Sequence, residues 1–544
     1  MSASSKKQLR REEAQANLTQ KQEATAKEMK KTKLYTALFV ALIAAMLVVV
    51  VVVGVQKSGI IERHTTAANV GGTDVSAVEL NYYYMDSLMN FVNQNSQIIS
   101  FIGLDPNKPL DKQQSMAGDG TTWGDYFLTE AKNGLQATYA MYNKAVAEGH
   151  KLSENEQKML DDTLASLKEI AKASNMSVSK YLTGIYGFNA DEKSYVHSLE
   201  VRTLAQSYLT AQQEALEISD EEIAAKDQAA PLDFNAYSYN IYNVNASDYR
   251  QGGTKDENGT TTYSDEEIAA SVKAAEEDAK ALVNGKPANA EALDKAIAAL
   301  AVNKDKKDVA SVDYDDKLLA QVPAEVKEWL ADDARKDGDI TYVERSTKDD
   351  NDKTVVTGYY VIMFRSSTDN SFSLADVRHI LVPFKGGKAD ANGNMTYTDE
   401  EKAAAKKEAE DLLQQWKDGE ATEDTFAKLA TEKSTDPGST ENGGLYEDVY
   451  PGQMVPTFND WCFDDARKTG DTGIVETSYG YHVMFYSGDS ETTYREHLIE
   501  STLFTEKMDA WYKEALDGCT VEITNSKYAP TDLILATRMQ PQVR

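Results

Sequence analysis

Two histidines in the second half of the chain could do chemistry together. His379 and His482 each lie in a run of alternating apolar residues typical of a strand, and neighbouring strands bring residues distant in sequence to one face of a sheet. An imidazole at neutral pH can transfer a proton, bind a metal or place a hydrogen bond. Three further histidines have no partner at ligand spacing and are expected at surface or helix-cap positions: His64, His150 and His197.

These two histidines belong to the second copy of a module that occurs twice. Tyr-Ser-Asp-Glu-Glu at 263–267 recurs as Tyr-Thr-Asp-Glu-Glu at 397–401. In the first copy Asn240 or a neighbour takes the place of His379, and Tyr360 takes the place of His482. When a fold is duplicated and only one copy keeps the candidate site residues, the residues common to both copies are expected to maintain the fold, and those found in one copy are expected to do the chemistry. We therefore predict a folded, catalytically silent first module that serves as a spacer or a peptide-binding surface.

The second copy contains an ordered series of short segments. They are Arg-His-Ile-Leu-Val at 378–382, Phe-Ala-Lys-Leu-Ala at 426–430, Ser-Thr-Asp-Pro-Gly-Ser at 434–439, Gly-Gly at 443–444, Gly-Gln-Met-Val-Pro-Thr-Phe at 452–458 and Thr-Ser-Tyr-Gly-Tyr-His at 477–482. This series resembles the parvulin family of peptidyl-prolyl cis/trans isomerases, and the match covers essentially all of residues 373–489. The resemblance implies catalysed rotation about Xaa-Pro bonds, with no cofactor.

The resemblance assigns a catalytic role to four polar residues. His379 and His482 match the two histidines that face each other across a parvulin site, and Thr477 matches the hydroxyl residue that links them. Asp436 falls where the family has cysteine or aspartate, with a one-residue ambiguity in its spacing to Gly444.

The resemblance also implies three substrate-binding residues. Met454 and Phe458 match the apolar pocket that receives the proline ring, although such residues taken alone are more often core than pocket. Tyr446 stands where the family usually has leucine, because the usual Gly-Asp-Leu-Gly is replaced by Leu-Tyr-Glu at 445–447. This departure leaves the shape of one pocket wall open.

The physical demands of amide rotation fit this set of residues. The rotational barrier of about 18–20 kcal/mol comes from amide resonance, and no bond has to break. A catalyst therefore need only bind the twisted amide better than the planar one, and polar side chains around an apolar proline slot can do so. A metal site of His379, Asp436 and His482 is a weaker interpretation, because apolar pocket residues accompany them. A Ser-His-Asp hydrolase is not supported, since the sequence lacks a Gly-x-Ser-x-Gly segment.

The rest of the sequence predicts an α+β protein of several domains, in which each module is a small antiparallel sheet with helices packed on it. Helical patterns dominate the region before the modules, notably Trp123–Glu148 and the segment that begins at Ser153. The predicted divisions are a cytoplasmic basic tail at 1–33, a transmembrane helix at 34–55, a helical chaperone-like domain at 68–230 completed by 490–520, a degenerate parvulin-like module at 233–368, a parvulin module at 372–489 and a C-terminal tail at 521–544.

Residues 34–55 form an uncharged apolar run that is long enough to span a bilayer as a helix. The preceding residues hold nine Lys or Arg and four Asp or Glu, which predicts a cytoplasmic N-terminus and an extracytoplasmic bulk. A cleaved signal peptide is the rival interpretation, but residues 54–57 offer no good cleavage site. We expect an uncleaved single-pass anchor in the cell membrane.

The net charge and the cysteine count limit the kinds of partner and of cross-link that the protein can have. The formal net charge is −31, which argues against nucleic acid binding. Cys462 and Cys519 are too few for a disulfide framework and are expected as unpaired buried thiols. The order of domains resembles foldases of the PrsA type, which implies unfolded or newly exported polypeptides with Xaa-Pro bonds as partners. The alternative function is a non-catalytic holdase whose modules only bind, although this would not explain why only one copy has the histidines.

Overall fold

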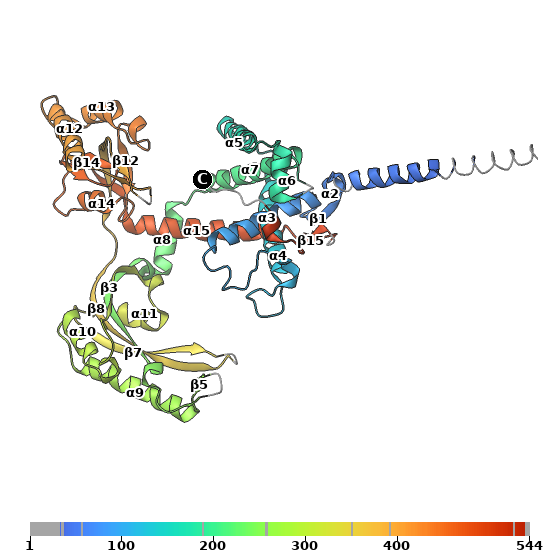
Figure 1. Cartoon of the computed structure of the whole chain (residues 1–544). Coiled ribbons are helices and arrows are strands. Elements are labelled where there is room, and N and C mark those ends of the chain that lie inside the picture. The colour runs from blue at the N-terminus through green and yellow to red at the C-terminus, as the bar shows by residue number, and fades with distance from the viewer. Residues whose placement is uncertain are drawn as a thin grey trace, which may run out of the picture. The chain divides into compact units, whose positions relative to one another are not determined.

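The computed structural model describes residues 33, 37, 39–55, 58–187, 190–255, 259–349, 352–390, 393–525 and 528–538. These residues fall into two compact units, one of residues 1–217 with 507–544 and the other of residues 218–506 (Figure 1). Helices dominate the first unit, and two four-stranded sheets dominate the second. The chain is therefore a mixed helix and sheet protein, as predicted.

The helices of the first unit have the expected end signals. They are α2 (Ile60–His64), α3 (Ala77–Gln94), α4 (Trp123–Glu148), α5 (Glu154–Ala173), α6 (Val178–Tyr186) and α7 (Glu192–Ala215). Ser153 and Glu156 form a reciprocal capping box at the start of α5, and Gly149 ends α4 in the left-handed conformation. Helices α3, α4, α6 and α7 contribute buried side chains to a core that includes Tyr82, Trp123 and Phe127.

The end of the chain is part of this first unit. A three-stranded sheet has the order β15 (Val521–Ile523), β1 (Thr66–Val70), β2 (Thr73–Ser76), with β1 antiparallel to both neighbours. Leu533 and Leu535 are buried in the same core. Residues 521–525 and 528–538 are therefore part of this unit, whereas the sequence predicted a separate C-terminal tail at 521–544. A three-residue strand whose partner lies at the other end of the chain leaves almost no local signal.

The helix at residues 39–55 exposes all its side chains. Within the described ranges, no helix is long and apolar enough to cross a membrane. The predicted span starts at residue 34, and residues 34–36 and 38 lie outside the described part of the chain.

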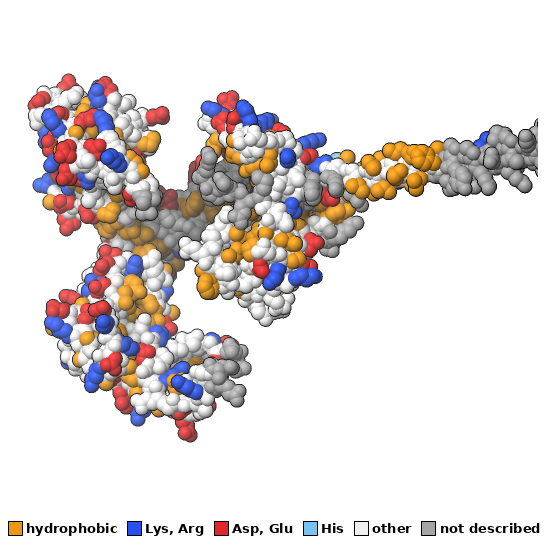
Figure 2. All heavy atoms as spheres, viewed as in Figure 1, with side chains coloured by type: hydrophobic (Ala, Val, Ile, Leu, Met, Phe, Trp, Pro, Cys, Tyr) orange, Lys and Arg blue, Asp and Glu red, His pale blue; other side chains and the backbone are white. Residues whose placement is uncertain are grey.

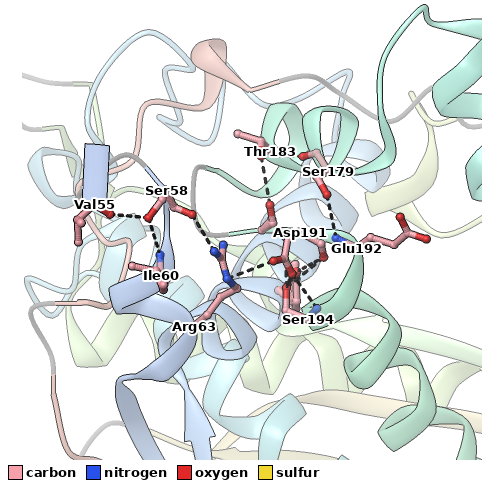
Figure 3. A network of polar contacts seen from close by, with 11 residues as sticks. Val55, Ser58, Ile60, Arg63, Ser179, Thr183, Asp191, Glu192 and Ser194 are labelled. Atoms are coloured by element: carbon pink, nitrogen blue, oxygen red, sulfur yellow. Dashed lines mark hydrogen bonds and ion pairs between the residues drawn. The ribbon is translucent and has the colours of Figure 1, made fainter. Parts of the chain in front are cut away.

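Polar contacts connect the end of this helix to the helical unit (Figure 3). The Ser58 hydroxyl donates to the Val55 carbonyl oxygen over 2.7 Å, and Arg63 Nη2 donates to the Ser58 carbonyl oxygen over 2.9 Å. Arg63 Nε lies 3.1 Å from Asp191, which is the N-cap residue of α7. Ser58 and Arg63 thus connect the end of the apolar helix to the start of α7.

In the second unit, the module with the histidines is built on one antiparallel sheet. Its strand order is β12 (Leu445–Val449), β9 (Ser373–Pro383), β14 (Gly480–Thr493), β13 (Thr472–Glu476). Helices α12 (Asp399–Lys417) and α13 (Glu423–Lys433) contribute to the core on one face, together with Ile380 and Val483. Helix α14 (Pro456–Cys462) packs with Val377 and Met484 in a second core cluster.

The other sheet of the second unit has the corresponding strand order. It runs β6 (Val312–Leu318), β3 (Ala236–Asn245), β8 (Thr354–Thr368), β7 (Ile340–Lys348), with helices α9 (Asp265–Asn284), α10 (Ala290–Ala298) and α11 (Ala324–Leu330). Among the described residues, the remaining α-helices are α8 (Asp220–Ala229) and α15 (Tyr494–Asp517). The remaining strands form two short hairpins, β4 (Thr254–Lys255) with β5 (Thr261–Thr262) and β10 (Lys388–Ala389) with β11 (Met395–Thr396).

The register of the two sheets identifies the residue that replaces the first histidine. His379 lies opposite Met484, four residues after Gly480, and Ile241 lies opposite Ile362, four residues after Gly358. Both glycines have φ near 150°, and a Cβ on either would lie 2.2 Å from a carbonyl oxygen of the neighbouring strand. Ile241, the neighbour of Asn240, therefore takes the place of His379.

Candidate active site

The two histidines come together because their strands are adjacent and antiparallel. His379 in β9 lies opposite Met484, and His482 in β14 lies opposite Leu381, so the two imidazoles are diagonal neighbours on one face of the sheet. Their rings stack with centroids 5.1 Å apart. Both side chains are buried, with 2% and 6% of their surface exposed.

A chain of hydrogen bonds links the four predicted catalytic residues. Nδ1 of His379 lies 2.9 Å from Nδ1 of His482, and Nε2 of His482 lies 2.9 Å from the Thr477 hydroxyl. At the other end, Nε2 of His379 lies 3.2 Å from Oδ2 of Asp436. The sequence prediction thus selected four side chains that the fold connects directly.

The loop that holds Asp436 is tied to β9 at several points. The Leu381 backbone N–H donates to the Ser434 hydroxyl, and the Leu381 carbonyl oxygen accepts from Thr435. Further along, the His379 backbone N–H donates to the Gly444 carbonyl oxygen over 2.8 Å. Gly444 has φ +74°, and a Cβ there would lie 2.3 Å from the His379 carbonyl oxygen. Glycine is therefore required where the loop passes β9.

Two further side chains contact the Asp436 carboxylate. The Ser439 hydroxyl donates to Oδ2 over 2.5 Å, and the Tyr446 hydroxyl donates to the same oxygen over 3.0 Å. The hydrogen bond from His379, outweighing the effect of burial, and those from Ser439 and Tyr446 hold the pKa of Asp436 well below its usual range. The carboxylate is therefore charged at neutral pH.

Burial is the main influence on the pKa of His482. It lowers the pKa of His482 to about 3, and the neighbouring His379 adds to this shift. His482 is therefore neutral at pH 7. An ionised carboxylate can only accept, so His379 Nε2 carries a hydrogen and donates it to Asp436.

The predicted proline-pocket residues border this polar chain. Phe458 packs edge-on against both imidazoles, with centroids 5.5 Å from His379 and 5.4 Å from His482. It is almost fully buried, whereas Met454 and Tyr446 are half-buried beside it. The Tyr446 ring stacks on His379 at 5.3 Å. Phe458 is thus the apolar floor beneath the histidines, and the other two residues border the site from the sides.

Comparisons with known proteins agree with this geometry. The family described as PPIC-type PPIASE domain matches residues 360–486. Foldase protein PrsA 1 of Listeria monocytogenes is 34% identical over 126 residues, which cover 22% of this chain and 42% of that protein. Residues 360–486 belong to the parvulin family. This parvulin-type peptidyl-prolyl isomerase domain contains every predicted site residue.

Two further matches are to a chaperone and to a solved structure. Chaperone SurA of Chromohalobacter salexigens is 33% identical over 158 residues, which cover 27% of this chain and 32% of that protein. The crystal structure of PrsA from Bacillus subtilis is 17% identical, with 74% of this chain and 89% of that chain covered and a TM-score of 0.24. The chain spans less than half the length of these curated PrsA and SurA relatives.

Sequence reasoning missed one member of the parvulin site and one set of contacts. Ser439, which is 1% exposed, was part of a recognised motif but had no role assigned to it. Tyr446 was expected to form a pocket wall, and its contact with Asp436 was not foreseen. Within the described residues, no three His, Cys, Asp or Glu side chains are grouped as a metal site. Both cysteines are unpaired and buried, as predicted.

Proposed function

We propose that the protein is an extracytoplasmic peptidyl-prolyl cis/trans isomerase and chaperone that assists the folding of exported polypeptides. The observation that carries the proposal is the continuous chain from Asp436 through His379 and His482 to Thr477, set against the apolar floor of Phe458. An apolar floor with a fixed charge beside it suits a proline ring whose amide bond must twist.

Electrostatics gives Asp436 a direct role in this proposal. A planar amide carries more negative charge on its carbonyl oxygen than a twisted amide, because twisting breaks the resonance. A fixed carboxylate near that oxygen therefore disfavours the planar state more than the twisted one and lowers the barrier. His379, His482 and Thr477 hold the carboxylate and the rim of the pocket in a single arrangement.

We propose that residues 34–55 anchor the chain in the membrane, with the N-terminus in the cytoplasm. In support, the helix at 39–55 presents apolar side chains on its surface, which appear orange in Figure 2. Such a surface is unfavourable in water and favourable in lipid. The excess of Lys and Arg before residue 34 supports the orientation.

We propose that the helical unit holds unfolded clients through exposed apolar residues. Phe101 is 88% exposed in the loop between α3 and α4, and Ile98 and Met116 of the same loop are also exposed. Isolated exposed apolar side chains are common, but several in one loop form a surface that an unfolded chain can contact.

We propose that the first module binds peptides without catalysis. For this module the proposal coincides with the holdase alternative, in which the modules only bind. A cavity of about 430 Å³ lies on the sheet face that bears Ile241 and Tyr360, the residues in the places of the two histidines. Tyr239 and Tyr314 also line it. This cavity offers aromatic contacts to a peptide but no imidazole or fixed carboxylate.

Refolding of a protein whose slow phase is limited by Xaa-Pro isomerisation tests the proposed function with the full chain. We expect wild-type protein to accelerate the slow phase and Asp436→Asn to lose most of the acceleration. Suppression of aggregation, measured by light scattering, should persist in the same variant. A variant that loses both activities while folded would contradict the division between catalytic domain and helical unit.

A further inference from the structure

One oxygen of Asp436 receives three donors from three different parts of the parvulin domain. Oδ2 lies 3.2 Å from His379 Nε2, 2.5 Å from the Ser439 hydroxyl and 3.0 Å from the Tyr446 hydroxyl. No side-chain or backbone donor among the described residues reaches Oδ1. The carboxylate is thus fixed through one oxygen.

Tyr446 differs from the other two donors because it contacts both ends of the His379–Asp436 pair. Its ring lies nearly parallel to the imidazole of His379, with an interplanar angle of 26°, while its hydroxyl reaches the carboxylate. Its place on β12 opposite Val377 of β9 directs the side chain over that pair. A leucine at this position could pack on the imidazole but could not donate a hydrogen bond.

The neighbouring loop leaves room for this hydroxyl. Gly438 lies in the loop between α13 and β12, and a Cβ there would lie 2.7 Å from the Tyr446 hydroxyl oxygen. The same Cβ would lie 3.6 Å from Asp436 Oδ2, an ordinary contact distance. A methyl group at this position would therefore displace the hydroxyl of Tyr446 and leave the carboxylate itself in place.

We propose that Tyr446 is a positioning residue, which fixes Asp436 against His379 in the isomerase site. The inference rests on the proposed catalytic function of this domain, and it assigns Tyr446 a task beyond that of a pocket wall. A hydrogen bond to the charged form of an acid favours ionisation, so loss of the phenol raises the pKa of Asp436. The other titratable groups facing this carboxylate are His379 from β9 and His482 from β14.

The test is the pH dependence of kcat/KM for an Xaa-Pro peptide, measured with the full chain. Tyr446→Phe keeps the stacked ring and removes only the hydroxyl, so we expect the acid limb to move to higher pH with KM unchanged. Gly438→Ala should produce the same shift with Tyr446 intact. The control is Tyr479→Phe, because this tyrosine is in the same domain but its side chain is exposed; the acid limb should not move.

A second readout does not depend on catalysis. The chain has six histidines, so labelling them with ¹³C at Cε1 gives few signals, and His379→Gln identifies the one of interest. We expect the His379 signal to sense Asp436 protonation at higher pH in Tyr446→Phe and Gly438→Ala than in wild type. If both variants fold and retain the wild-type acid limb and the wild-type response of the His379 signal to Asp436, the inference is wrong. If the wild type is inactive, the proposed function fails, while the His379 titration still decides the role of Tyr446.

Discussion

Mild acid should destabilise the parvulin domain through His482. Burial lowers the pKa of this histidine to about 3 in the folded domain, whereas an unfolded histidine has its ordinary value of 6.5. As pH falls below 6.5, His482 becomes protonated in the unfolded domain but stays neutral in the folded domain. The neutral imidazole therefore contributes stability that is complete above pH 6.5 and is lost progressively as pH falls toward 3.

The size of the effect follows from the same two values. Each pH unit between them costs about 1.4 kcal/mol, so lowering the pH from 7 to 5 should reduce the free energy of unfolding by about 2 kcal/mol. This corresponds to an increase of roughly 30-fold in the unfolded population. Asp436 does not interfere in this window, because its lowered pKa affects stability only as pH falls below the unfolded value of 3.8.

Hydrogen exchange of the full chain, read by mass spectrometry on β9 and β14 peptides, measures this free energy locally. After correction for intrinsic exchange rates, the wild type should lose about 2 kcal/mol of protection between pH 7 and 5, and His482→Gln should lose almost none. His497 on α15 also has a pKa lowered by burial, so His497→Gln is the matched control and should retain the wild-type slope on these peptides. Equal slopes in wild type and His482→Gln would refute the reasoning.

Three further outcomes are expected. Asp436→Asn should lower kcat/KM for an Xaa-Pro peptide by about 100-fold with little change in KM, because it removes the charge and keeps the shape; NMR exchange rates measure this. Gly444→Ala should destabilise the domain by about 3 kcal/mol in urea unfolding, because the added Cβ would clash with the His379 carbonyl oxygen. The control is Gly452→Ala, which should cost only about 1 kcal/mol because the space around Gly452 is open. Phe101→Ser should weaken suppression of client aggregation in light scattering and leave the isomerisation rate unchanged, since Phe101 lies in the helical unit.

The sequence predicted the site well where its signals were local. His379 and His482 lay in period-two apolar runs, so both strands and the faces of their side chains could be predicted. The capping box at Ser153 and the glycine at position 149 marked helix ends in the same direct way. Each of these features depends on residues a few positions apart, which is the range that a single sequence reveals.

Contacts between distant segments were harder to predict. Strand β15 pairs with β1, which lies more than 450 residues earlier in the chain, and the local sequence around Val521 does not predict this pairing. Ile241 could be distinguished from Asn240 only by the strand register, because a shift of one residue turns every side chain to the other face. Tyr446 meets Asp436 only because β12 lies beside β9, so its donor role required the folded sheet.

The most direct test of the account is the exchange rate between cis and trans Xaa-Pro in a short peptide, measured by NMR with the full chain. We expect wild-type protein to accelerate exchange and His379→Ala and His482→Ala, checked for folding, to lose the acceleration. Acceleration that survives in both folded variants, or its absence in folded wild-type protein, would contradict the assignment of catalysis to these histidines.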